Sequence, residues 1–338
     1  MPLTDVPAPD HLAAAYAVTR AATRRTPLLE APDLARACGA ARLFVKAENL
    51  QRAGSFKIRG AYWRLTRLSQ DAAARGVVAY SSGNFAQGLA AAGAELGVPV
   101  TIVMPVDAPE MKRRATEAFG ARVVLSDHGD RPREEVASAL AARLAADEGL
   151  TLLHPFDDPE IVAGQAGAGL EALEQMAEMG AEAPDVVACP VGGGGLLGGV
   201  ALAVRAARPE AAIFAVEPQG YDGMGRSLAQ GERLRLTGGG ATICDALQAT
   251  QPGAAPFAAA RAAGVTGLVV TDAQVAHAMR AAFEQLKLVL EPSGAVALAA
   301  ALAGDLPLAG RSALILVTGG NVTFDHFAAC LSCEEIRT

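Results

Sequence analysis

The chain has 338 residues, of which 51% are hydrophobic, 19% charged and 4% aromatic, and its net charge is −7. So many apolar and so few charged residues exclude a disordered protein, and the acidic balance leaves no basic face for a nucleic-acid backbone. The length suggests about two domains, each able to bury a core without disulfides or metals. The N-terminus MPLTDVPAPD has no signal segment and the five cysteines are scattered, so we expect a cytoplasmic protein in a reducing compartment.

Short β-branched runs alternate with Ala-rich helical runs along the chain. We predict strands at 43–45, 77–80, 100–104, 122–125, 151–153, 186–190, 213–216, 268–270 and 314–317. We expect helices between them, among others at 85–96, 111–119, 133–147, 165–179 and 272–288. Apolar strands separated by helices of this length predict βαβ units and an α/β fold of parallel sheets.

Nine predicted strands are too many for one small sheet, so we predict two open parallel-sheet domains. Residues 55–157 would form the smaller domain, and residues 1–54 with 158–338 the larger one. Open parallel sheets bind ligands beyond the carboxyl ends of their strands, so the residues that follow each strand are the candidates for a site. The charge-free stretch 186–204 contains six glycines and Pro190, which indicates a strand, a glycine loop and a helix rather than a membrane span.

The first motif along the chain is GSFKIRGA at 54–61. It places one lysine between Phe56 and Ile58 in a turn of small residues. Desolvation there would lower the pKa of Lys57 and favour the neutral amine that forms a Schiff base. The alternative is an ordinary surface lysine.

The second motif is SSGN at 81–84, between a predicted strand and a predicted helix. Hydroxyls and free N–H groups at a helix start suit a carboxylate ligand. The alternative is a serine that caps the helix and needs no ligand.

The third motif is the run of four glycines at 192–195, followed by Leu196. Successive bare N–H groups at a helix N-terminus form a cradle for an anion, usually a phosphate. The same region also satisfies GxGxxG, with Glu217 19 residues after Gly198, as in a dinucleotide site. Phosphate cofactor, dinucleotide and close packing alone are therefore all open for this segment.

The fourth motif is VTGGN, in which Thr318 follows the last predicted strand. Together the four motifs resemble the fold-type II pyridoxal-phosphate family, in its serine/threonine dehydratase and serine racemase branch. The resemblance also runs through RRTPLLE, HPFDDPEIVAGQAGAGLE, AVEP and EPSGAVALAA, and so covers nearly the whole chain. It implies a cofactor in the cleft between two α/β domains. It also favours pyridoxal phosphate over a dinucleotide, which leaves the lysine motif unexplained.

The resemblance implies a role for each matching residue. Lys57 corresponds to the Schiff-base lysine, Phe56 to the residue packed on the cofactor ring, and Asn84 to the partner of the ring hydroxyl. The phosphate loop corresponds to Gly192, Gly193, Gly194, Gly195 and Leu196, and the hydroxyl facing the pyridine nitrogen to Thr318. The loop that holds the substrate carboxylate corresponds to Ser81, Ser82, Gly83, Asn84 and Phe85.

The activity that the resemblance implies is an ammonia-lyase, which converts L-threonine, L-serine or a related 3-hydroxy amino acid to a 2-oxo acid and ammonia. Ser82 stands where the racemases carry a serine opposite the lysine, so serine racemase is an alternative with Ser82 as a second catalytic residue. Arg133 matches an arginine that binds a distal acidic group, which makes 3-hydroxyaspartate another candidate substrate. An exposed arginine at a helix start is the alternative for Arg133.

The resemblance leaves a divalent cation open. Relatives activated by Mg²⁺ or Ca²⁺ use two carboxylates around AVEP. Here Glu217 is present, Gly223 occupies the second position and Asp222 is adjacent to it. We further expect a homodimer, a small amino acid as substrate, and neither nucleic acid nor membrane as partner. Two other classes, an NAD-linked oxidoreductase and a cofactor-binding protein without activity, are kept as alternatives; the intact Lys57 argues against the latter.

Overall fold

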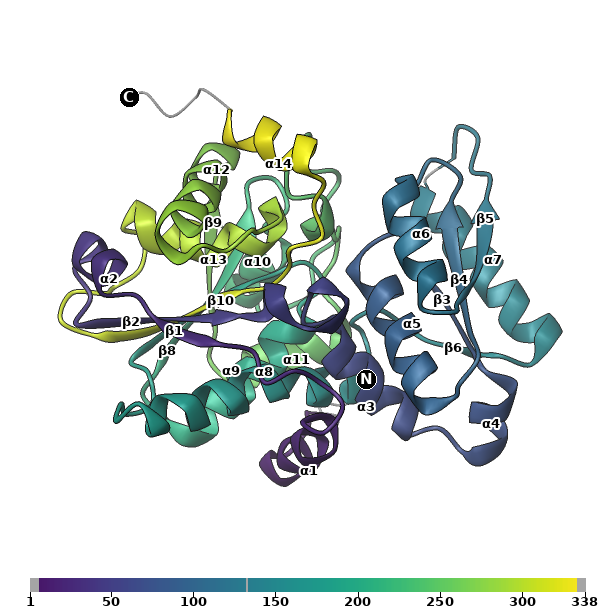
Figure 1. Ribbon diagram of the computed structural model, residues 1–338, viewed down its shortest axis with the longest axis horizontal. Helices are drawn as coiled ribbons and strands as arrows, with labels where there is room; N and C mark the ends of the chain where they lie inside the picture. Colours follow the sequence, from purple (N-terminus) through teal and green to yellow (C-terminus); the bar gives the residue numbers. More distant parts are fainter. Residues whose placement is uncertain (1–5, 132, 333–338) are drawn as a thin grey trace.

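The computed structural model describes residues 6–131 and 133–332, which form two sheets with their helices, seen side by side in Figure 1. The six-stranded sheet contains β1 (Leu28–Glu30), β2 (Arg42–Ala47), β7 (Val186–Pro190), β8 (Ala212–Pro218), β9 (Thr266–Val270) and β10 (Ser312–Val317). The four-stranded sheet contains β3 (Val77–Tyr80), β4 (Val100–Pro105), β5 (Arg122–Ser126) and β6 (Thr151–Leu152).

Helices cover both sheets (Figure 1). Those with the larger sheet are α1 (Pro9–Thr19), α2 (Pro32–Cys38), α8 (Pro159–Glu178), α9 (Gly195–Ala207), α10 (Gly223–Gln230), α11 (Ala254–Ala262), α12 (Asp272–Ala281), α13 (Pro292–Ala303) and α14 (Phe324–Leu331). Those with or next to the smaller sheet are α3 (Lys57–Thr66), α4 (Gln70–Arg75), α5 (Asn84–Leu96), α6 (Glu110–Ala118) and α7 (Arg133–Glu148). Short 3-10 turns are η1 (Glu48–Leu50), η2 (Arg52–Gly54) and η3 (Asp245–Leu247), and η4 (Ala282–Leu286) is a π-helical turn.

The six-stranded sheet has the order β1-β2-β10-β7-β8-β9. The pairs from β2 to β9 are parallel, as predicted, and these strands are buried because helices pack on both faces. The edge strand β1 differs: it pairs antiparallel with β2, with Leu28 opposite Lys46. Our prediction missed β1 because three residues between Pro27 and Pro32 carry no periodic signal, so the prediction of purely parallel sheets is wrong at this edge.

The four-stranded sheet has the order β5-β4-β3-β6 and is parallel throughout. Its apolar side chains pack against α3 and α5 on one face and against α7 on the other. The C-terminal end of β3 leads directly to the segment 81–84, and that of β7 to the glycines at 192–195. Both predicted binding motifs therefore lie where parallel sheets bind ligands.

Two predicted helix boundaries differ from the structure. α8 begins at Pro159, six residues before the predicted start, because Asp158 caps it by accepting the Glu160 N–H at 2.8 Å. α12 ends at Ala281, and the chain continues in the π-helical turn η4 to Leu286. Within the described part of the chain, no helix is long and apolar enough to cross a membrane.

Candidate active site

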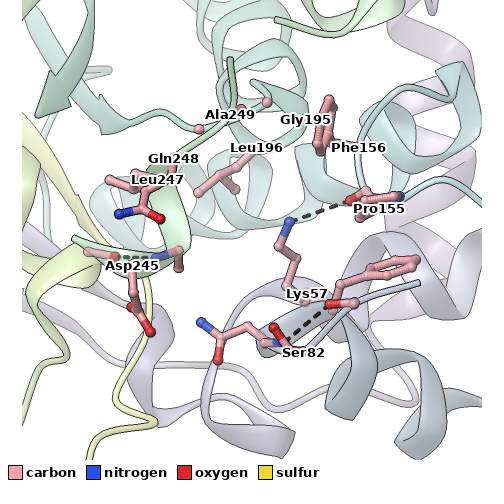
Figure 2. Close-up of a pocket in the computed structure, with 18 of the residues that line it drawn as sticks. Lys57, Ser82, Pro155, Phe156, Gly195, Leu196, Asp245, Leu247, Gln248 and Ala249 are labelled. Atoms are coloured by element: carbon pink, nitrogen blue, oxygen red, sulfur yellow. Dashed lines mark hydrogen bonds between the residues drawn. The ribbon is translucent and has the colours of Figure 1, made fainter. Parts of the chain in front are cut away.

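A cavity of roughly 400 Å³ lies between the two sheets. Its wall is built from the segments that follow β3, β7 and β10, together with the first residues of α3. All residues that the sequence analysis assigned to the site line this one cavity: Phe56, Lys57, Ser81, Ser82, Gly83, Asn84, Phe85, Arg133, Gly192, Gly193, Gly194, Gly195, Leu196 and Thr318. Figure 2 shows Lys57 inside it, with residues 245–249 on another wall.

Lys57 is the first residue of α3, not part of a free turn as the sequence suggested. Its Nζ donates to the carbonyl oxygen of Pro155 at 3.4 Å and lies 5.1 Å from the ring centre of Phe56 and 5.9 Å from that of Phe85. The side chain opens only into the cavity, and this desolvation lowers the pKa of Lys57 to about 8, although the charge of Glu291 opposes the shift. Lys57 is therefore an amine that loses its proton near neutral pH and can act as nucleophile or base.

The glycine loop connects β7 to α9 and is buried except for part of Gly192. Gly194 has φ of 96°, a left-handed conformation that glycine adopts without strain. A Cβ on Gly193 would lie 2.2 Å from ring carbons of Phe156, and one on Gly194 would lie 2.5 Å from Cε of Met224. The loop therefore needs glycine at both positions, and it presents bare N–H groups at the start of a 13-residue helix, an arrangement suited to a phosphate.

The segment 81–84 connects β3 to α5. The N-cap of α5 is Gly83, and no side chain caps the helix, so the alternative in which a serine acts as the N-cap is wrong. Ser81 instead accepts the Gly83 N–H on its Oγ at 3.3 Å. Ser81, Ser82 and Gly83 line the cavity at the start of this helix, which is the position we predicted for a carboxylate site.

Asn84 is held by two partners on its carboxamide. Its Nδ2 donates to Oε1 of Glu291 at 2.5 Å, and its Oδ1 accepts from Nδ2 of Asn321 at 2.7 Å. Glu291 is buried, which raises its pKa to about 7, and it packs against Gly319, the residue after Thr318. Sequence reasoning gave Glu291 no role; its position just before Pro292, at the start of α13, is a signal that could have identified it.

Three more cavity residues were not predicted. Lys112 on α6 donates to Oδ2 of Asp245 in η3 at 2.6 Å, so this ion pair joins the small-sheet side to the large-sheet side. Gln165 on α8 is 1% exposed, and neither polar atom of its carboxamide has a hydrogen-bond partner. A buried, unpartnered amide in a cavity wall indicates that a polar ligand or water completes it.

Arg133 is half-exposed at the first position of α7. Its Nη2 lies 3.0 Å from Oδ1 of Asp107, so its charge is partly neutralised at the edge of the cavity. The structure thus places Arg133 both in the cavity wall and in a surface ion pair.

Glu217 does not fit a cation site. Its two carboxylate oxygens accept the N–H groups of Met224 and Gly225 at 2.8 Å each, at the start of α10. Burial raises the pKa of Glu217 to about 8 against the effect of these two donors. In the described ranges, no three His, Cys, Asp or Glu side chains are grouped so as to hold a metal ion. We derive no metal chemistry for this site.

Comparisons with known proteins agree with this geometry. Residues 19–319 match the family described as "Pyridoxal-phosphate dependent enzyme". The chain is 40% identical over 308 residues to an L-threo-3-hydroxyaspartate ammonia-lyase of Pseudomonas sp., covering 91% of this chain and 93% of the relative. The family match decides the glycine loop in favour of pyridoxal phosphate over a dinucleotide.

Solved structures show the same similarity. A bacterial threonine deaminase, from the organism abbreviated T.th., is 40% identical with a TM-score of 0.86, over 94% of this chain and 99% of that one. Maize serine racemase is 33% identical with a TM-score of 0.88, over 96% of both chains. With matches over nearly the whole length of the chain and a lysine and glycine loop in one cavity, this protein belongs to the pyridoxal-phosphate dependent enzyme family.

Proposed function

We propose that this protein is an ammonia-lyase that converts a 3-hydroxy amino acid to a 2-oxo acid and ammonia. The observation that carries the proposal is the placement of Lys57, with its lowered pKa, in the same enclosed cavity as the glycine loop. Relatives named ammonia-lyase and threonine deaminase, at 40% identity, support the reaction class.

The residues present fit pyridoxal phosphate. The bare N–H groups of Gly192–Gly195 and Leu196 would hold its phosphate, and the amine of Lys57 would bind its aldehyde. Around the ring, Phe56 would pack on one face, Asn84 would meet the ring hydroxyl and Thr318 the pyridine nitrogen. The unpartnered amide of Gln165 also gives the wall hydrogen-bonding capacity for a polar guest.

When bound, the cofactor supplies an acceptor for the electron pair left at Cα of the amino acid. The protein positions the substrate and moves its proton. Ser81, Ser82 and Gly83 would bind the substrate carboxylate beside α5. Lys57 Nζ, with a pKa of about 8, then takes the Cα proton as a general base. Thr318 contributes a neutral hydroxyl, which is a weaker partner for the ring nitrogen than a carboxylate.

One observation favours 3-hydroxyaspartate among the substrates. The cavity wall contains two cationic side chains, Lys112 and Arg133, and a distal carboxylate would satisfy both. Two relatives bear the name L-threo-3-hydroxyaspartate ammonia-lyase, from Pseudomonas sp. and, at 37% identity, from Saccharomyces cerevisiae. Serine racemisation stays a second candidate function because Ser82 offers a hydroxyl in the cavity and maize serine racemase is similar over 96% of the chain.

The experiment is a substrate profile of the purified holoenzyme. The 2-oxo acid, ammonia and D-serine are measured with L-threonine, L-serine and L-threo-3-hydroxyaspartate. We expect equal amounts of 2-oxo acid and ammonia, with D-serine at most a minor product. Arg133→Met should lower kcat/KM for the hydroxyaspartate more than for L-threonine. Release of D-serine without ammonia, or no product from any of the three, would refute the proposal.

We also propose that the protein is a cytoplasmic homodimer and that residues 55–157 form a domain distinct from 1–54 and 158–338. An apolar face supports the dimer: Phe283 and Phe324 are exposed, with Phe283 packed edge-on against Phe327 at 5.7 Å. The surface near η1 continues it, since Asn49 Nδ2 donates to the carbonyl oxygen of exposed Val289. Light scattering should give twice the chain mass, and Phe283→Glu should give a monomer; a monomeric wild type would refute it.

A further inference from the structure

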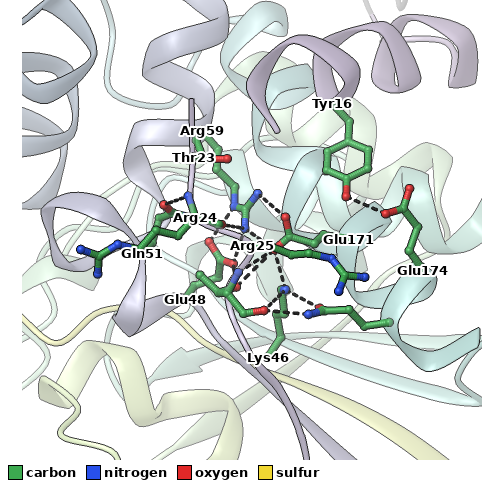
Figure 3. A network of polar contacts seen from close by, with 12 residues as sticks. Tyr16, Thr23, Arg24, Arg25, Lys46, Glu48, Gln51, Arg59, Glu171 and Glu174 are labelled. Carbon is green, nitrogen blue, oxygen red and sulfur yellow. Dashed lines mark hydrogen bonds and ion pairs between the residues drawn. The ribbon is translucent and has the colours of Figure 1, made fainter. Parts of the chain in front are cut away.

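A cluster of four buried ionic side chains lies where α3 meets the six-stranded half of the molecule (Figure 3). Lys46 and Arg59 are basic, Glu48 and Glu171 are acidic, and none is more than 1% exposed. Two positive and two negative charges balance. We call these four residues the buried charge cluster.

Arg59 belongs to α3 and stands two residues after Lys57. Its Nε and Nη2 donate to the two carboxylate oxygens of Glu48, each at 2.8 Å, and Nη2 also donates to Oε1 of Glu171 at 2.7 Å. Glu48 directly follows β2, and Glu171 lies on α8. One guanidinium therefore fixes α3 to a strand end and to a helix of the other half.

Lys46 completes the cluster from β2. Its Nζ donates to Oε1 of Glu171 and Oε1 of Gln175, both at 2.7 Å, and to the carbonyl oxygen of Thr26 at 2.8 Å. These three bonds use all the hydrogens of the ammonium group. Burial lowers the pKa of Lys46; burial would raise that of Glu48, but Arg59 holds it below its usual value.

Such a cluster contributes little net stability. Removing each ion from water costs several kcal/mol, and the attraction within the cluster only about repays it, so apolar residues of the same volume would be as stable. A bidentate guanidinium does, however, accept its carboxylate in one planar orientation. What the buried charge cluster adds is a fixed geometry for the helix that carries Arg59.

The first turn of α3 is held by close packing as well. A Cβ on Gly164 of α8 would lie 2.7 Å from Cα of Gly60, and one on Gly88 of α5 would lie 3.0 Å from Cβ of Lys57. These glycines let α3 approach helices on both sides, but apolar contacts allow a helix to rotate or slide. The ionic contacts of Arg59 oppose that movement.

We propose that Arg59 is a positioning residue for Lys57: held by Glu48 and Glu171, it fixes the first turn of α3 and so directs Lys57 Nζ into the cavity. Arg59 does not line the cavity and acts only through the helix. The inference rests on the proposed function, in which Lys57 is the reacting amine. A shift of about 1 Å at a reacting atom can reduce the rate by about 100-fold, so a loosened helix has a measurable effect.

The test measures the Lys57 amine directly, in the apoenzyme. The chain has only four lysines, at positions 46, 57, 112 and 287, so acetylation of each is resolved by peptide mass spectrometry. In the wild type, the labelling of Lys57 should rise with a midpoint near its pKa of about 8. In Glu48→Gln/Arg59→Met, which removes one anion and one cation together, we expect the midpoint to move up toward the usual 10.5, because the amine loses its desolvated position.

The holoenzyme gives the second readout. We expect kcat of the double variant to fall about tenfold or more while KM changes little, because the substrate-binding loop is unaltered. Arg59→Lys keeps the charge but not the planar fork, and should behave like the double variant. The matched control is Arg64→Met on the same helix, which removes a more exposed ion pair with Asp158 at 2.6 Å and should leave the Lys57 midpoint and kcat unchanged.

Two results would overturn the proposal. One is a folded double variant with the wild-type midpoint and kcat, which would show that Arg59 serves the fold alone. The other is failure of Arg59→Lys and of the double variant to fold. A wild-type protein that binds no pyridoxal phosphate would instead refute the proposed function, while the labelling midpoints would still decide the effect of Arg59 on Lys57.

Discussion

Replacing Gly193 with alanine tests whether the glycine loop is a binding surface with no room for a side chain. The added Cβ would lie 2.2 Å from Cγ and Cδ2 of Phe156 and 2.4 Å from Cδ1, so the ring has to move. Phe156 itself lines the cavity, as Figure 2 shows, and the displaced ring or the displaced loop would take space that a ligand needs.

The size of the effect follows from the cost of overpacking. Forcing an extra carbon into a packed site typically costs about 1–3 kcal/mol. Since about 1.4 kcal/mol corresponds to a factor of ten, the dissociation constant of pyridoxal phosphate should rise about 5- to 150-fold if the cost falls on the complex. The part that falls on the apoenzyme instead lowers its Tm.

The assay is a titration of apoenzyme with pyridoxal phosphate, followed by absorbance, for wild type, Gly193→Ala, Phe156→Ala and the double variant. If the ring is the obstacle, the effects of the two substitutions are not additive, and Gly193→Ala costs less affinity when Phe156 is absent. Wild-type affinity and wild-type Tm in Gly193→Ala would refute the reasoning, because the alanine would then fit where the structure leaves no space.

Three further predictions concern the same site. Lys57→Ala should abolish both turnover and the visible absorbance of bound cofactor, while in the wild type the rate of cofactor capture should rise as pH passes about 8, since only the neutral amine reacts; a flat pH profile would contradict the lowered pKa. The apoenzyme should also gain stability between pH 8 and 10.5 from this residue, because the unfolded chain then holds a proton that the native amine has lost. Gln165→Met should raise the Tm of the apoenzyme by removing an unpartnered amide worth about 1–3 kcal/mol, yet weaken cofactor or substrate binding; a lower Tm would show that the amide has a partner in the apoenzyme. Thermal shift with Mg²⁺ or EDTA should leave the Tm unchanged because backbone amides occupy both oxygens of Glu217, and a clear shift with Mg²⁺ would refute this.

Sequence alone determined the alternation of strands and helices. The strands β3 and β7 lie at the predicted residues, Val77–Tyr80 and Val186–Pro190, because buried parallel strands are short apolar runs that end at glycine or proline. The same local signals located the motifs around Lys57, Ser82 and the glycine loop, since ligands bind beyond strand ends. The order of the motifs then identified the family.

Tertiary structure decided what depends on residues far apart in the chain. The pairing of Asn84 with Glu291 joins positions 207 residues apart, and that of Arg59 with Glu171 joins positions 112 apart. No local pattern encodes such contacts, because burial and partner choice arise only when helices and strands pack. For the same reason the sequence named Lys57 and placed it in a turn, whereas the packed structure shows it at the start of α3 and surrounds it with the apolar wall that lowers its pKa.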